Sequence, residues 1–237
     1  MAVAATFSRM PSLSDRRVST IFAFVLASGL CGALLLVRTV ETGSSNYRFL
    51  VWNLVLAWVP FLLALALYDA NRRGAARPWQ LMLAAGWLLF LPNAPYIVTD
   101  FLHVGVIGGA PIWFDASLVA VFAAAGVMLG LASLLLVQSV VSRAWGDLSS
   151  WLVLVPVFGL CSLGIALGRI ARFNSWDAVS QPDAILRVLG DRLLDPGTAV
   201  RGAALVGALT VSLSVGYLVL YAVAGLVPRR ERSVERD

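Results

Sequence analysis

Three stretches of the chain contain polar residues whose types and spacing could support chemistry. The first holds the sequence P-N-A-P at positions 92–95 and continues with Tyr96, Asp100 and His103, the only histidine. In a helix these three residues fall at i, i+4 and i+7 and therefore share one face. A carboxyl group and an imidazole at i, i+3 can serve as an acid–base pair. Asp100 and His103 are therefore the candidate catalytic residues.

The other two stretches supply charges of both signs. One is Asp115, and the other is the run G-R-I-A-R-F-N-S-W-D from position 168. Arg169 and Arg172 are about one helical turn apart, so both can face the same way. Two neighbouring guanidinium groups suit a phosphate or a carboxylate. The candidate ligand-binding residues are Asn93, Tyr96, Asp115, Arg169, Arg172, Asn174 and Asp177.

The same residues also admit a purely structural interpretation. Ionisable groups inside membrane spans are costly and usually face a partner. Asp100 and Asp115 need counter-charges, and Arg169 and Arg172 are the obvious candidates. Such ion pairs would lock helices together without binding any ligand.

The composition excludes several classes of function. The chain is 59% hydrophobic and 13% charged, whereas soluble domains are about 45–50% apolar and about 25% charged. The net charge is +5, but the basic residues are all Arg and most flank apolar runs, which favours membrane orientation over nucleic-acid binding. A lone histidine without nearby thiolates gives little support to a metal site. No cofactor or catalytic fingerprint is present, so we expect neither a metal nor a cofactor.

Six apolar runs are long enough to cross a hydrocarbon core of about 30 Å. They lie at 18–37, 49–68, 79–102, 112–140, 150–170 and 203–227. We therefore expect an all-α fold: a polytopic transmembrane helix bundle that forms a single domain over 18–227, after a leader at 1–17 and before a tail at 228–237. The amphipathic segment 183–194 is too short to span and predicts an interfacial helix between spans five and six.

The distribution of Arg predicts the orientation of these spans. With the N-terminus inside, the leader, the second loop, the fourth loop and the tail carry three, three, one and four Arg. The first and third loops carry two and none, and the long connection between spans five and six carries five. Short loops weigh most in the positive-inside rule, so we expect both termini in the cytoplasm. The three polar stretches then lie together at the outer side of the membrane.

The P-N-A-P sequence is expected to break the third helix. Each proline removes a backbone donor and obstructs the preceding turn, and Asn93 would be a good N-cap for a new helix. Non-helical backbone at membrane depth must be buried in protein or line a wet cavity, so the break should face the bundle. The G-x-x-x-G spacings at 126–130 and 164–168 predict close approach of helices.

Four runs together resemble a known family. They are N-L-V-L-A-W-V-P from Asn53, W-L-L-F-L-P-N-A-P-Y-I-V-T-D-F-L-H from Trp87, W-F-D at Trp113 and the run from Gly168. They are similar to the bacterial membrane-protein family called domain of unknown function 1361, over roughly residues 48–220. The resemblance implies a multi-pass protein of the bacterial inner membrane. It implies no activity and assigns no catalytic residue.

Three functional hypotheses remain open. The first is a binding or transport protein whose outer polar cluster holds a small anion or a lipid headgroup. The second is a structural or assembly protein whose polar network only fixes helix packing. The third is a membrane-embedded enzyme acting on a lipid or headgroup. The expected partners are the lipid bilayer and the anionic ligand, without nucleic acid; no protein partner is indicated.

Overall fold

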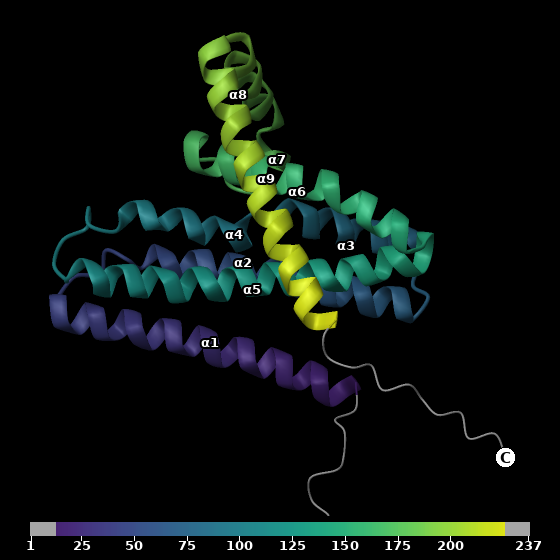
Figure 1. Cartoon of the computed structure of the whole chain (residues 1–237), viewed down its shortest axis with the longest axis horizontal. Helices are drawn as coiled ribbons and strands as arrows, with labels where there is room; N and C mark the ends of the chain where they lie inside the picture. Colours follow the sequence, from purple (N-terminus) through teal and green to yellow (C-terminus); the bar gives the residue numbers. More distant parts are fainter. Residues whose placement is uncertain (1–12, 226–237) are drawn as a thin grey trace, which may run out of the picture.

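The protein, described here from a computed structural model over residues 13–225, is helical throughout that range (Figure 1). The tail and most of the leader lie outside the described residues. The elements, in chain order, are α1 (Leu13–Thr42), α2 (Phe49–Arg72), α3 (Arg77–Phe90), α4 (Asn93–Tyr96), the 3-10 helix η1 (Ile97–His103), α5 (Ile112–Trp145), α6 (Asp147–Ala171), α7 (Asp177–Ser180), α8 (Pro182–Leu194) and α9 (Pro196–Gly225).

In the described part of the chain, six helical segments are long and apolar enough to cross a membrane. They are Arg17–Thr42, Phe49–Arg72, Arg77–His103, Ile112–Trp145, Asp147–Ala171 and Gly197–Val223. Each overlaps one of the six apolar runs, and the third includes the break. The all-α, polytopic helix bundle is therefore confirmed, and the chain is a multi-pass membrane protein.

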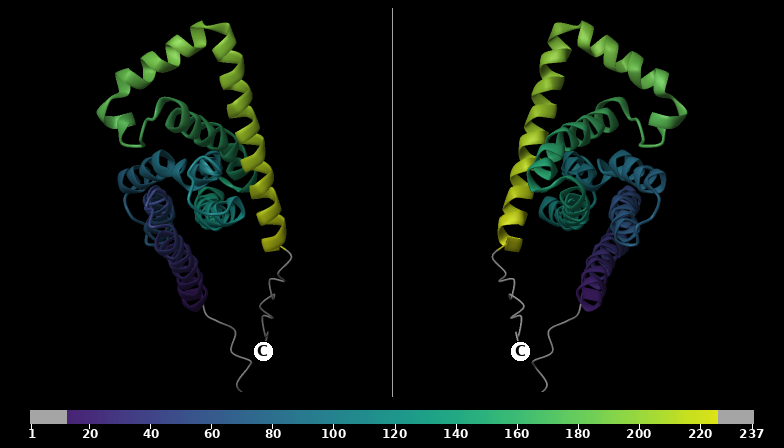
Figure 2. Two further views of the ribbon diagram at one scale, coloured as in Figure 1. Left: turned by 90° about the vertical axis from the view of Figure 1, so that its left-hand side faces the viewer. Right: turned by 90° about the vertical axis from the view of Figure 1, so that its right-hand side faces the viewer.

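Helix α5 is the centre of the bundle. It packs against α1, α2, α4, η1 and α6, and more of it is buried than of any other candidate span, at 61% of its most apolar window. Helix α9 behaves differently. It packs mainly on α6 and α8, crosses the long helices steeply and projects beyond them together with α8 (Figures 1 and 2). Only 6% of its apolar window is buried, so most of α9 is available to lipid.

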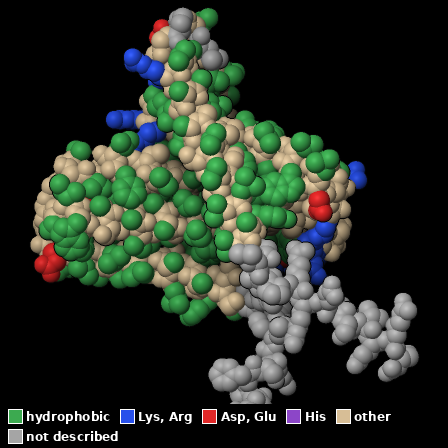
Figure 3. All heavy atoms as spheres, in the orientation of Figure 1, with side chains coloured by type: hydrophobic (Ala, Val, Ile, Leu, Met, Phe, Trp, Pro, Cys, Tyr) green, Lys and Arg blue, Asp and Glu red, His purple; other side chains and the backbone are tan. Residues whose placement is uncertain are grey.

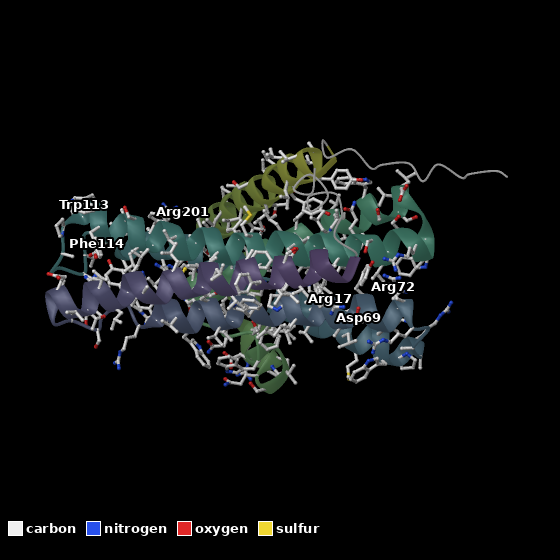
Figure 4. The ribbon with its side chains drawn as sticks, turned by 90° about the horizontal axis from the view of Figure 1, so that it is seen from below. Arg17, Asp69, Arg72, Trp113, Phe114 and Arg201 are labelled. Carbon is white, nitrogen blue, oxygen red and sulfur yellow. The ribbon has the colours of Figure 1, made fainter. Side chains whose placement is uncertain are left out.

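The bundle has two chemically distinct ends and an apolar flank. Figure 4 shows Arg17, Asp69 and Arg72 at one end and Trp113 and Phe114 at the other. Arg17 and Asp69 are joined by an exposed ion pair of 2.8 Å. On the face drawn in Figure 3, hydrophobic side chains cover the long helices, and charged side chains lie at the ends and on the projecting part.

Two helix boundaries bear on the predictions. Helix α1 continues to Thr42 and ends before Gly43, whose φ of +64° suits glycine. Arg38 therefore lies in a helix, and its expected position in a loop is wrong. The segment 183–194 is helical as expected, within α8.

Candidate functional site

The break in the third helix is confirmed and has a clear hydrogen-bonding role. Helix α3 ends at Phe90, and α4 begins at Asn93 after a two-residue turn. Asn93 does not cap α4. Its Nδ2 instead donates to the carbonyl oxygen of Phe90 at 2.9 Å and to Oγ of Ser175 at 2.8 Å. The expected N-cap is wrong because the prolines free carbonyl groups at the end of α3, and the Asn93 amide satisfies one of them.

The broken segment is held between two helices by their glycines. A Cβ at Gly126 of α5 would lie 2.7 Å from the carbonyl oxygen of Ala94, and one at Gly130 would lie 2.9 Å from its Cβ. On the other side, a Cβ at Gly164 of α6 would lie 2.5 Å from Cγ of Pro92, and one at Gly168 would lie 3.2 Å from the Tyr96 ring. Both G-x-x-x-G spacings therefore admit the turn, not a continuous helix. The break is buried in protein, as membrane depth requires.

A polar cavity of about 640 Å³ lies beside this segment. We call it the polar cavity. Helix α2, the segment from α3 to η1, α6, the loop after α6 and one residue each of α7 and α8 line it: Phe49, Trp52, Asn53, Leu56, Leu89, Pro92, Asn93, Tyr96, Asp100, His103, Gly164, Leu167, Gly168, Arg169, Arg172, Phe173, Asn174, Ser175, Ala178 and Ile185. Tyr96, Asp100 and His103 thus share a face as predicted, and the P-N-A-P and R-F-N-S segments meet there.

Asp100 is the buried anion of the polar cavity. Its side chain is 2% exposed and accepts a hydrogen bond from Nδ2 of Asn53 at 2.8 Å. Nη1 of Arg169 lies 3.4 Å from its Oδ1, so the predicted pairing of Asp100 with Arg169 is confirmed. His103 is less closely engaged. Its Nδ1 lies 3.9 Å from Oδ1 of Asp100 and 3.2 Å from the Asp100 carbonyl oxygen.

Arg172 is held in an uncommon backbone conformation at the end of α6. Its φ and ψ are 60° and 28°, and its N–H donates to the carbonyl oxygen of Leu167. Glycine is the usual residue at a left-handed helix terminus because it has no Cβ to clash there. Arg172 is exposed and lines the polar cavity. Among the residues that the structure describes, no carboxylate lies within 4 Å of its guanidinium group.

Two of the candidate ligand-binding residues are occupied elsewhere. Asp177 accepts a 2.7 Å hydrogen bond from the main-chain N–H of Asn174 and so shapes the loop after α6. Asp115 pairs with Arg38, with 2.6 Å between Nε and Oδ1, and both side chains are at most 1% exposed. The expectation that Arg169 or Arg172 neutralises Asp115 is wrong. Neither Asp115 nor Asp177 lines the polar cavity.

The buried pair reaches the polar cavity through Tyr47. The Tyr47 hydroxyl lies 3.3 Å from Oδ2 of Asp115 and donates to the carbonyl oxygen of His103 at 3.2 Å. The Arg38 guanidinium lies over the Tyr47 ring, 4.3 Å from its centroid. Burial and the Asp115 charge raise the pKa of Tyr47 to about 12. The network therefore contains a neutral phenol that fixes the end of η1.

The comparisons with known proteins identify the family. Residues 52–218 match the model of a family described as a protein of unknown function, DUF1361. The chain belongs to this family. No curated protein and no solved structure was found to match it.

The family match contains nearly all of the polar cavity. Every lining residue except Phe49 falls between 52 and 218, and so do all the candidate catalytic and ligand-binding residues. Arg38 and Tyr47 lie before the matched region. No three His, Cys, Asp or Glu side chains between residues 13 and 225 are arranged to hold a metal ion.

Sequence reasoning missed Arg38, Tyr47 and Ser175. Arg38 directly follows an apolar run, and a predicted loop hid its burial. A signal was nevertheless present, because Asp115 needs a counter-charge at the same membrane level. Ser175 lies in the R-F-N-S-W-D run that was singled out, but nothing in its spacing indicates Asn93 as its partner.

Proposed function

We propose that the polar cavity binds a small anion or the anionic headgroup of a larger molecule. The supporting observation is a local excess of positive charge. Arg169 and Arg172 both line the cavity, and Asp100 is the one acidic residue among the described residues that line it. Asn53 and Arg169 already contact Asp100. The charge of Arg172 is therefore left for a ligand.

The remaining lining residues suit a ligand with hydroxyl or phosphate oxygens. Asn174 brings a side-chain amide next to Arg172, and Tyr96 brings a phenol on the facing wall. Hydrogen bonds between charged donors and an oxyanion are roughly twice as strong as neutral ones. The apolar residues Leu56, Leu89 and Ile185 can accept the uncharged part of the same molecule.

We further propose that the protein lies in the bacterial inner membrane, with both termini in the cytoplasm and the polar cavity toward the outer side. The bias of Arg toward the leader, the second and fourth loops and the tail supports this orientation. A reporter that is active only in the cytoplasm, fused after Asp237, should be active. Activity of a periplasm-specific reporter at the same position would contradict the proposed orientation.

Acid–base catalysis on the bound ligand is a second candidate function. It is favoured by the proximity of Asp100 and His103, which line the polar cavity 3.9 Å apart. Under this hypothesis, Asp100→Asn keeps ligand binding and abolishes turnover. The structural hypothesis predicts instead that Asp100→Asn and Arg172→Gln both reduce the folded yield in detergent. Normal folding of both variants would contradict it.

Mass spectrometry of molecules that co-purify with the protein tests the binding function. An anionic compound should accompany the wild type and be lost from Arg172→Gln. Arg187→Gln is the matched control, because Arg187 is exposed on α8 and does not line the polar cavity. It should retain the compound. Equal amounts in the wild type and Arg172→Gln, or no anionic compound in either protein, would contradict the proposal.

A further inference from the structure

A second cavity of about 460 Å³ lies between α6, α8 and α9. We call it the apolar groove. Its walls are mostly hydrocarbon, with Ile170 from α6, Leu189 from α8 and Leu205 from α9. Because α9 is hardly buried within the protein, the groove adjoins a helix that faces lipid. Its ordinary surroundings in a membrane are therefore acyl chains.

Two arginines interrupt the apolar walls of this groove. Arg192 comes from α8 and Arg201 from the first turns of α9, and both line the groove. No acidic residue occurs among the described residues that line it. In the described part of the chain, neither guanidinium group has a carboxylate within 4 Å. The groove thus combines an apolar surface with two uncompensated positive charges.

The nearest acidic residue in the sequence is engaged by its own helix. Asp195 accepts a hydrogen bond from Oγ1 of Thr198 at 2.9 Å and another from the N–H of Gly197 at 3.3 Å. The hydrogen bond from Thr198 holds the pKa of Asp195 below its ordinary value. Asp195 therefore stays ionised as a cap of α9 and does not neutralise the arginines that flank it in the chain.

We propose that the apolar groove is a binding site for an anionic membrane lipid. The phosphate group is held between Arg192 and Arg201, and an acyl chain lies against Ile170, Leu189 and Leu205. Guanidinium groups bind phosphate through charge-assisted hydrogen bonds, and basic pockets between membrane helices bind anionic headgroups. A free anion would gain nothing from the apolar walls, and a zwitterionic lipid would gain less from the two charges.

This site is separate from the polar cavity. Leu167 lines both, but the charged residues differ: Arg169 and Arg172 belong to one, Arg192 and Arg201 to the other. The two proposals can therefore fail independently. A variant of one arginine set should leave binding at the other site unchanged.

Native mass spectrometry of the full chain in detergent tests the proposal. The protein is titrated with phosphatidylglycerol and with phosphatidylcholine of the same acyl chains. We expect a one-to-one complex with phosphatidylglycerol at a concentration about tenfold lower than with phosphatidylcholine. The double substitution Arg192→Gln with Arg201→Gln should remove this preference, whereas Arg187→Gln on the exposed side of α8 should keep it.

Further arms secure the interpretation. The double substitution to Lys keeps the charge and should retain most of the preference, which tests the site even if the Gln variant folds poorly. Equal affinity for the two lipids in the wild type would overturn the proposal. So would an unchanged preference in a folded Gln variant, or loss of the preference in Arg172→Gln. Displacement of phosphatidylglycerol by millimolar inorganic phosphate would identify a phosphate site instead of a lipid site.

Discussion

Pro92 lies directly over Gly164: its Cγ is 2.5 Å from the position that a Cβ on residue 164 would occupy. This contact joins the break in the third span to α6, and α6 carries the arginines of the polar cavity. The proline that ends α3 is thus also the surface on which the cavity wall is seated. The position of Arg169 and Arg172 depends on a glycine one to two turns earlier in the same helix.

We therefore predict that Gly164→Ala destabilises the protein. The added methyl group overlaps a rigid proline ring, and such overpacking costs about 1–3 kcal/mol. Gly159→Ala is the matched control on α6, because a Cβ there has no atom within 4 Å. It should be neutral or stabilising by about 0.5–1 kcal/mol, as alanine favours a helix. Thermal unfolding in detergent compares the two; equal stability would contradict the close approach.

The buried pair of Arg38 and Asp115 yields a second prediction. Asp115→Asn leaves the Arg38 charge uncompensated in the interior, which costs about 3–5 kcal/mol. Asp69→Asn breaks the exposed pair with Arg17 and should cost no more than about 1 kcal/mol. Replacing Arg38 and Asp115 together by Met and Leu should restore most of the lost stability. A small effect of Asp115→Asn alone would show that the pair is not buried.

Tyr47 gives a prediction with a defined pH dependence. Its pKa is raised to about 12, above the ordinary value near 10. The folded state therefore favours the neutral phenol, and the resulting stability is full below the unfolded pKa and lost as the pH rises toward the folded one. The stability difference between the wild type and Tyr47→Phe should be constant below about pH 10 and shrink between about pH 10 and 12. A difference that grows over this interval would contradict the environment described for Tyr47.

How much of this site the sequence predicts depends on the kind of interaction. The P-N-A-P break, the shared face of Asp100 and His103, and the pairing of Asp100 with Arg169 follow from proline chemistry, helical periodicity and the cost of burying charge. The partner of Asp115 does not follow, because three arginines at one membrane level could neutralise it. Only the packing of α1 on α5 selects Arg38.

Backbone geometry was the other limit. The G-x-x-x-G spacings predict close contact, but spacing cannot tell that a turn, not a helix, fills it. The left-handed conformation of Arg172 has no sequence signal either, because glycine or asparagine is the usual marker. The cavity wall at the end of α6 is therefore visible only in three dimensions.

Arg172 should be a residue that trades stability for function. In the left-handed region a non-glycine residue costs about 1–2 kcal/mol, so Arg172→Gly should raise stability by about 1 kcal/mol, as glycine suits this terminus. The same substitution should abolish anion binding. Chemical denaturation in detergent measures the first effect. A less stable Arg172→Gly would indicate that Arg172 contributes to packing and would favour the structural hypothesis.

Isothermal titration of the purified protein with glycerol 1-phosphate, in detergent free of phospholipid, tests anion binding at the polar cavity most directly. Glycerol 1-phosphate carries a phosphate and hydroxyl groups but no acyl chain, so it probes the polar cavity and not the apolar groove. Binding should be saturable in the wild type and in Arg187→Gln, and at least about tenfold weaker in Arg172→Gln. Binding of equal strength in all three proteins, or no binding to glycerol 1-phosphate, inorganic phosphate or citrate in the wild type, would contradict the proposed function.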